Sequence, residues 1–226
     1  MSHLIQDTYQ EYRHGIRENF AQFSHQLFQV FLVGMTIGMM RTVVPALGET
    51  EFGVPKGSFM LLTTFVVAFG FVKGTLNFVA GRLSERIGRQ KVLLIGWAVA
   101  VPIPFMILYA PSWNWIVVAT VLLGVNQGLT WSMTQTSKLD ITRPDQRGFV
   151  IGLNEFAGYV GLAIAGIITG YMATAYGPRH GLLIFGIAVI ALAALLTLLW
   201  DKVSLTHSRV SSAARAITAI PNISKP

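Results

Sequence analysis

The chain has 226 residues, of which 53% are hydrophobic and only 12% are charged, and it contains no cysteine. Soluble domains carry about 25% charged residues, so this composition excludes an ordinary soluble domain and is typical of an α-helical membrane protein. The lack of cysteine excludes disulfides and thiolate metal sites. The formal net charge of +7 does not indicate nucleic-acid binding, because the basic residues lie in short segments between long apolar runs.

The first 26 residues are predicted to form an amphipathic helix on the membrane surface or on a partner. Apolar residues recur in this segment at intervals of three or four, which places them on one helical face: Ile5, Tyr9, Tyr12, Ile16, Phe20 and Phe23. The alternative is a polar tail. The segment is too polar to be a secretory signal.

Six apolar stretches are long enough to cross a hydrocarbon core of roughly 30 Å, which takes about 20 helical residues. They cover residues 27–47, 58–80, 91–110, 114–136, 149–173 and 181–200. The segments between them contain glycine, proline and polar residues, which favour turns. We therefore predict an all-α membrane domain over residues 27–200, followed by a cytoplasmic tail or linker over 201–226.

The basic residues predict the direction of the spans. The N-terminal segment, the 81–91 loop, the 137–148 loop and the C-terminal tail hold 13 of the 17 lysines and arginines, and with six spans these segments share one side. The opposite loops hold only Lys56 and Arg179. By the positive-inside rule both termini are cytoplasmic. We expect a multi-pass protein of a bacterial inner membrane.

The 81–91 loop, GRLSERIGRQK, lies between the second and third spans. Topology accounts for its basic residues but not for its glycines and its acid. A glycine at 81 allows close approach of another backbone, and one at 88 allows a turn with positive φ. The carboxylate of Glu85 can accept hydrogen bonds from a helix N-terminus and pair with an arginine.

The spacing of this loop resembles the Gly-x-x-x-Asp-Arg-x-Gly-Arg loop that the major facilitator superfamily carries between its second and third spans. The matching residues are Gly81, Glu85, Arg86, Gly88 and Arg89, with Glu85 in place of the usual aspartate. The resemblance implies that the loop is a conformational lock that joins two half-transporters during alternating access. It also implies that the six spans form two inverted three-helix repeats, half of a major facilitator fold.

Two departures from the superfamily bear on the driving force. Proton-coupled members often carry Arg-x-x-Gln-Gly in the fourth span, whereas this chain has Gln127 and Gly128 but glycine at position 124. Drug antiporters usually have a Gly-Pro pair in the fifth span, and none is present here. These motifs therefore do not support proton-driven drug export.

Ionisable residues inside a span are functional candidates, because placing each in the bilayer costs about 2.5–3.5 kcal/mol or more. Lys73 and Glu155 are candidates for a coupling or buried charge. In the superfamily the first and fourth spans line the cavity, so the resemblance implies a set of solute-binding residues: Arg41, Asn126, Gln127 and Trp131. Arg41 suits an anion. The alternative for Arg41 and Lys73 is that each extends along its aliphatic stem to the headgroups.

Glycines four residues apart allow helices to approach closely in lipid, and four such pairs are predicted packing contacts: Gly34/Gly38, Gly70/Gly74, Gly148/Gly152 and Gly166/Gly170. The sequence contains no nucleotide-binding loop, metal-ligand spacing or nucleophile–base set. We therefore expect no catalytic residues, no cofactor and no metal site.

Six spans build only one wall of a superfamily transporter, whose solute lies between two six-span halves. Three interpretations remain open. The chain is a half-transporter for a small polar or anionic solute that pairs with itself or with a separate second half. It is a structural or assembly subunit of a larger membrane complex, without transport. Or it is a truncated product or isolated N-terminal half.

Overall fold

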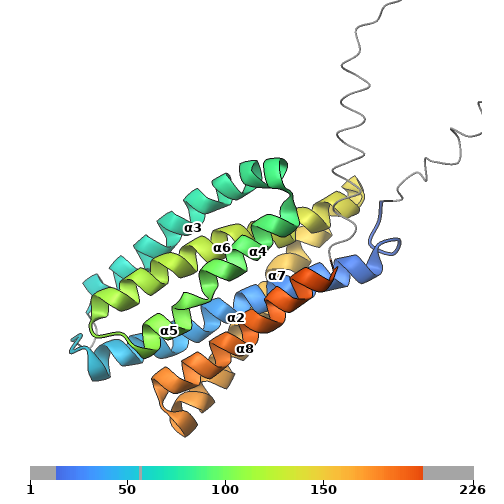
Figure 1. The fold of residues 1–226 in the computed structure, drawn as a ribbon. Helices are drawn as coiled ribbons and strands as arrows, with labels where there is room; N and C mark the ends of the chain where they lie inside the picture. The colour runs from blue at the N-terminus through green and yellow to red at the C-terminus, as the bar shows by residue number, and fades with distance from the viewer. Residues whose placement is uncertain (1–13, 56–57, 201–226) are drawn as a thin grey trace, which may run out of the picture.

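The computed structural model describes residues 14–55 and 58–200 (Figure 1). These residues form helices and connecting turns without any strand, in this order: α2 (Phe20–Glu51), α3 (Phe59–Ile87), α4 (Arg89–Ala100), α5 (Pro102–Leu108), α6 (Trp113–Ile141), the 3-10 helix η1 (Pro144–Gln146), α7 (Arg147–Tyr176) and α8 (Pro178–Trp200). Within the described part there are six helical stretches long and apolar enough to cross a membrane. The predicted all-α fold with six spans is confirmed.

The third span consists of two helices, α4 and α5, instead of one. Pro102 is the first residue of α5, where its fixed φ suits a helix start and its missing N–H removes a bond to the preceding turn. The backbone N–H of Val101 bonds the carbonyl of Ala98, a tighter turn than an α-helix makes. The sequence-based span over 91–110 therefore contains a break.

The predicted amphipathic helix over residues 1–26 falls largely outside the described residues, including Ile5, Tyr9 and Tyr12. Residues 15–19 form a bend and a turn, and residues 20–26 belong to α2, so the first span begins earlier than predicted. The backbone N–H of Gly15 and the amide of Asn19 both donate to the carbonyl of Ile141, at 2.8 and 3.1 Å. The described N-terminal turn thus docks on the α6–α7 connection of the same chain.

The two ends of the bundle are joined differently. One end of the bundle, which we call the basic end, contains the start of α2, the α3–α4 and α6–α7 connections and the end of α8. Gly15 contacts Ile141 there, Arg89 contacts Asp140, and the amide of Gln90 donates to the carbonyl of Thr197. The α2–α3, α5–α6 and α7–α8 connections form the opposite end.

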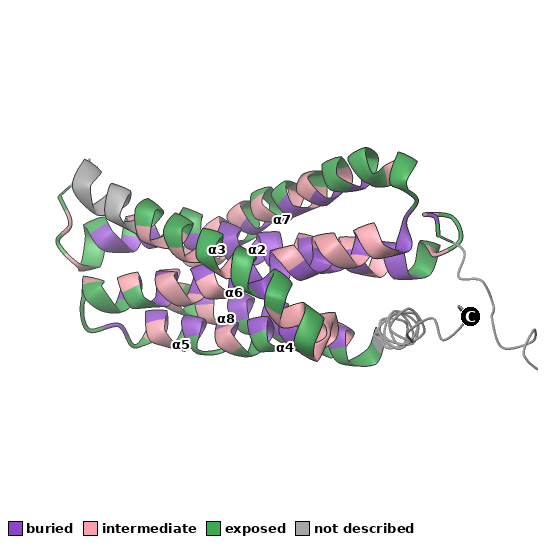
Figure 2. Ribbon diagram, turned by 90° about the horizontal axis from the view of Figure 1, so that it is seen from above, coloured by how far each residue is buried: buried purple, intermediate pink, exposed green. Residues whose placement is uncertain are grey.

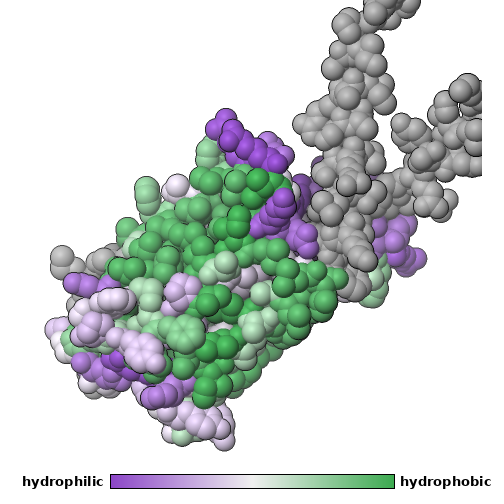
Figure 3. Space-filling model, in the orientation of Figure 1, coloured by the Kyte–Doolittle hydropathy of each residue, from purple (hydrophilic) through white to green (hydrophobic). Residues whose placement is uncertain are grey.

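Helices α2 and α6 form the centre of the bundle, and their membrane-spanning parts are mostly buried. Helix α2 packs against α7, α8 and α6, while α6 packs against α3 and α4. Figure 2 shows that α3 and α7 carry long exposed stretches. The face in Figure 3 is largely apolar, with hydrophilic side chains gathered toward its ends, as a lipid-facing surface requires.

Close helix contacts depend on glycine. A Cβ atom placed on Gly34 would lie 1.9 Å from the carbonyl oxygen of Gly158, and one on Gly161 would lie 2.1 Å from that of Phe31, so α2 and α7 touch through their backbones. Gly128 allows α6 the same approach to Lys73 and Leu76 of α3.

The four predicted glycine pairs divide into two classes. Gly34 and Gly38 pack inside the chain, and Gly166 lies beside Thr42. In contrast, a Cβ on any residue of the other two pairs would meet no atom of the described structure within 4 Å: Gly70, Gly74, Gly148 and Gly152. These two pairs lie on α3 and α7, the two helices with the most exposed faces.

Arg179 holds the opposite end of the bundle together. Its Nη1 donates to the carbonyl oxygens of Leu108 and Ala110, at 2.9 and 3.0 Å, and its Nε pairs with Glu51 at 2.7 Å. Its guanidinium also lies 5.1 Å from the centre of the Phe52 ring. One side chain of α8 thus joins the ends of α2 and α5.

Replacing Arg179 by alanine is expected to lower the free energy of unfolding by about 1–3 kcal/mol, because partly buried carbonyl groups lose their donor. Thermal unfolding of the detergent-solubilised chain measures the effect. His180→Ala, a change at the exposed neighbouring residue, is the matched control and should unfold at the wild-type temperature. Equal stability of Arg179→Ala and wild type would show that the contacts of Arg179 do not stabilise this end of the bundle.

Candidate solute-binding site and lock loop

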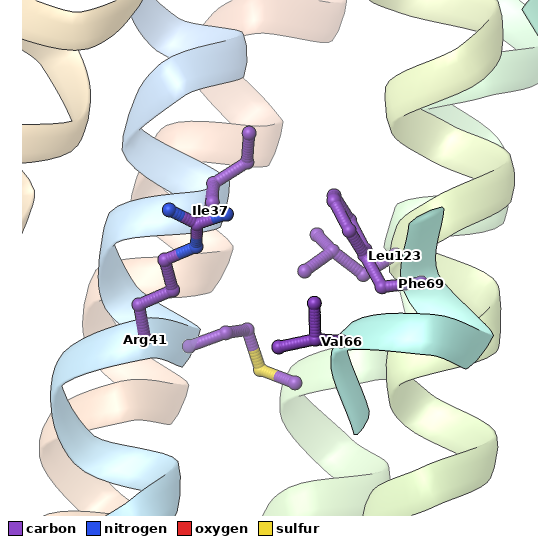
Figure 4. A pocket seen from close by; sticks show the side chains of 6 residues that line it. Ile37, Arg41, Val66, Phe69 and Leu123 are labelled. Atoms are coloured by element: carbon purple, nitrogen blue, oxygen red, sulfur yellow. The ribbon is translucent and has the colours of Figure 1, made fainter. Parts of the chain in front are cut away.

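A small pocket, with a cavity volume of about 20 Å³ and open on one side, lies between α2, α3 and α6. Its lining comes from all three helices: Ile37, Met40, Arg41, Val66, Phe69 and Leu123. Figure 4 shows the Arg41 guanidinium turned toward Ile37 on the α2 side, with Val66, Phe69 and Leu123 across from it. The sequence-predicted Arg41 therefore lies at a cavity.

Arg41 is exposed, and within residues 14–55 and 58–200 it makes no hydrogen bond or ion pair. A guanidinium keeps its positive charge in any protein environment and presents several N–H donors in a plane. Surrounded by apolar side chains, this cation is suited to a carboxylate or another anion.

Trp131 of α6 brings together the two predicted buried charges, which come from different helices. The Nζ atom of Lys73 lies 4.4 Å from the centre of its ring, a cation–π contact. On the other side its indole N–H donates to Glu155 Oε1 at 2.9 Å. Lys73 and Glu155 thus flank one indole, with no direct salt bridge between them, and the sequence did not predict this arrangement.

The neighbours of Trp131 fix its position. A Cβ atom on Gly158 would come within 2.3 Å of the indole, so only glycine at this place in α7 leaves room for it. Tyr159 contacts the ring edge-on, with the ring centres 6.3 Å apart. The amide of Asn154 donates to the same Glu155 oxygen at 3.2 Å.

Asn126 and Gln127, the other two predicted solute-binding residues, are fully buried and bonded to neighbouring helices. The amide of Asn126 donates to the carbonyl of Gly96 on α4 at 2.9 Å. The amide of Gln127 donates to the carbonyl of Val33 and to the hydroxyl of Thr36, both on α2. In this structure the two side chains hold the bundle together and do not line the pocket.

Gly88 alone lies between α3 and α4, so the rest of the predicted 81–91 loop is helical, and the first residue of α4 forms an ion pair. Arg89 Nη2 lies 2.6 Å from Asp140 Oδ2, so the start of α4 is tied to the end of α6. Gly88 has φ +90°, the positive value predicted for this position. Arg89 pairs with Asp140 and not with Glu85, so an arginine partner for Glu85 stays a prediction.

The other predicted lock residues face away from the chain. Glu85 and Arg86 are exposed, and neither forms an ion pair with another described residue. Gly81 has no atom near the place of a Cβ, so the close backbone approach that we predicted for it is not made by this chain. The end of α3, which carries these residues, is therefore open to contact from outside the described chain.

Lys138 is a buried cation that the sequence did not reveal. We expected it in a basic loop, but it lies in α6, fully buried, and its Nζ donates to the carbonyl of Gln26 at 3.0 Å. Its position near the end of a span, beside polar residues, looks like a loop in the sequence. No group of three or more potential metal ligands occurs among the residues described.

Comparison with known proteins agrees with this architecture. Residues 27–223 match the Major Facilitator Superfamily. The 4-hydroxybenzoate transporter PcaK of Pseudomonas putida is 29% identical over 172 residues, which cover 76% of this chain and 37% of the relative. The proton-coupled antiporter flippase LtaA of Staphylococcus saprophyticus is 24% identical over 205 residues, which cover 90% of this chain and 49% of the relative.

The chain therefore spans half or less of the length of these relatives. The family match covers five spans completely, the first span from residue 27 onward, and the segment that resembles the superfamily lock. This chain belongs to the Major Facilitator Superfamily and is a transporter-type membrane protein, not an enzyme.

Proposed function

We propose that this chain is one half of a secondary transporter and moves a small anionic solute by alternating access after pairing with a second six-span half. The observation that carries the proposal is Arg41, a cation at a pocket between α2, α3 and α6 without an ionic partner in the described structure. Lys73 adds a second positive charge on the neighbouring helix.

The exposed faces of α3 and α7 support pairing. These helices carry Gly70, Gly74, Gly148 and Gly152, where an added Cβ would meet no atom of the described residues within 4 Å, and Gly81 and Glu85 face outward. Small residues that allow close packing are useful only against another helix. A second six-span half, either a copy of this chain or a separate one, would cover them.

One relative supports a small organic anion as the solute class, since it is named for 4-hydroxybenzoate, which is an organic anion at neutral pH. Most of the lysines and arginines that the structure describes lie at the basic end, so we propose that this end and both termini are on the cytoplasmic side of a bacterial inner membrane.

Uptake of radiolabelled benzoate into liposomes containing the full chain tests the proposal. We expect saturable uptake, reduced at least about tenfold in Arg41→Gln because the anion loses its charged partner. Arg17→Gln, which removes an exposed charge of the N-terminal turn outside the pocket, is the matched control and should retain uptake. Equal uptake by Arg41→Gln and wild type would contradict the role of the pocket.

A further inference from the structure

A continuous row of charged and aromatic side chains runs from the pocket to α7. Arg41 and Phe69 line the pocket, and Lys73, one helical turn along α3, places its Nζ 5.9 Å from the centre of the Phe69 ring. Lys73 also lies over Trp131, whose N–H donates to Glu155. Lys73 is attracted by Glu155 and repelled by Arg41, so the three charges act on one another.

The charges in this row do not cancel. Arg41 and Lys73 contribute two positive charges, and Glu155 contributes one negative charge, which leaves one positive charge. One Glu155 oxygen accepts hydrogen bonds from both Trp131 and Asn154, which is the arrangement that suits a carboxylate acceptor.

The remaining nearby cation does not enter this count. Lys138 also attracts Glu155, but its side chain is fully buried and its Nζ is bonded to the carbonyl of Gln26. Lys138 also lies seven residues along α6 from Trp131, about 10 Å at 1.5 Å per residue, so its charge acts on the row more weakly than the charges within it.

We propose that Glu155 sets the charge of the solute, so that the site accepts organic anions with a single negative charge and discriminates against dianions. This inference rests on the proposed function. An anion with one charge neutralises the row, whereas a second carboxylate would leave an uncompensated negative charge in a site of low dielectric and would be repelled by Glu155. Specificity of this kind uses a repulsive group built into the site.

Three probes with the same ring and different charge test the inference: benzamide, benzoate and phthalate, which carry none, one and two negative charges at about pH 8. Affinity is measured by isothermal titration calorimetry on the full chain in lipid nanodiscs. We expect wild type to prefer benzoate over both other probes. Glu155→Gln raises the charge of the row by one and should shift the benzoate-to-phthalate affinity ratio at least about tenfold toward phthalate.

A second variant keeps the test decisive if Glu155→Gln does not fold. Lys73→Gln lowers the charge of the row by one and should remove the preference of benzoate over benzamide. Glu49→Gln removes an exposed carboxylate of α2 outside the row and should keep the wild-type order.

The outcomes separate the two proposals. Binding of benzoate and phthalate with the same ratio in wild type, Glu155→Gln and Glu49→Gln would overturn the role of Glu155 and leave the anion site standing. Failure of the wild-type chain to prefer either acid over benzamide would overturn the anionic solute itself, and with it both proposals.

Discussion

Replacing Gly34 by leucine is expected to prevent the six-span unit from folding. A Cβ atom at this position would lie 1.9 Å from the carbonyl oxygen of Gly158, and 2.8 Å from its carbonyl carbon. Backbone atoms cannot move aside as a flexible side chain can, so α2 and α7 would have to separate. Since these helices form the most extensive contact in the bundle, we expect a loss of roughly 3 kcal/mol or more.

Gly152→Leu is the matched control for Gly34→Leu. Gly152 lies on α7, and a Cβ there would meet no atom of the described structure within 4 Å. We expect this variant to fold like wild type but to weaken pairing with a second half. Size-exclusion chromatography and thermal unfolding in mild detergent measure both effects. Normal folding of Gly34→Leu would contradict the close α2–α7 contact.

Replacing Arg89 by glutamate is expected to reduce transport at least about tenfold while the chain still inserts and folds. The change places two negative charges at a contact that now measures 2.6 Å between Arg89 and Asp140, so the start of α4 is repelled from the end of α6. Both side chains are partly exposed, and a surface pair of this kind contributes only about 0–1 kcal/mol to stability. The effect should therefore appear in transport.

The double variant Arg89→Asp/Asp140→Arg restores an attractive pair and should recover most of the lost uptake. Uptake is compared in liposomes that contain equal amounts of inserted protein. If Arg89→Glu transports normally, or if the exchanged pair is no better than the single variant, the ion pair has no part in the conformational cycle.

The spans were predictable because an apolar stretch of about 20 residues has the length and composition of a membrane-spanning helix. The structure extends most of them at one or both ends, as with α6, which continues to Ile141 beyond the predicted end at 136. Hydropathy identifies only the residues that lie in the hydrocarbon core. A helix can continue into polar residues beyond it and ends where its terminal backbone N–H and C=O groups bond to other groups. The break before Pro102 follows from proline chemistry but is not visible in hydropathy.

The candidate site was only partly predictable. Arg41, Lys73, Trp131 and Glu155 were named from their type and depth, but the sequence did not reveal that Lys73 and Glu155 flank the same indole. Asn126 and Gln127 looked equally suited to bind a solute, but both bond to neighbouring helices. A polar side chain in a span can either line a cavity or form hydrogen bonds between helices, and the sequence does not distinguish the two roles. Three-dimensional packing decides between these roles.

The glycine pairs show the same limit. Gly34/Gly38 and Gly70/Gly74 have the same spacing, yet the first pair packs inside the chain, whereas no residue of the described part packs against the second. Spacing predicts a close contact but not which helix makes it.

The most direct test of the central claim, that this chain is one of two six-span halves, is native mass spectrometry of the particle that transports benzoate in liposomes. The account predicts a mass of two six-span units, either twice 24.7 kDa or 24.7 kDa plus a second chain of similar size. A transport-competent particle that contains a single copy of 24.7 kDa and no other protein would contradict it.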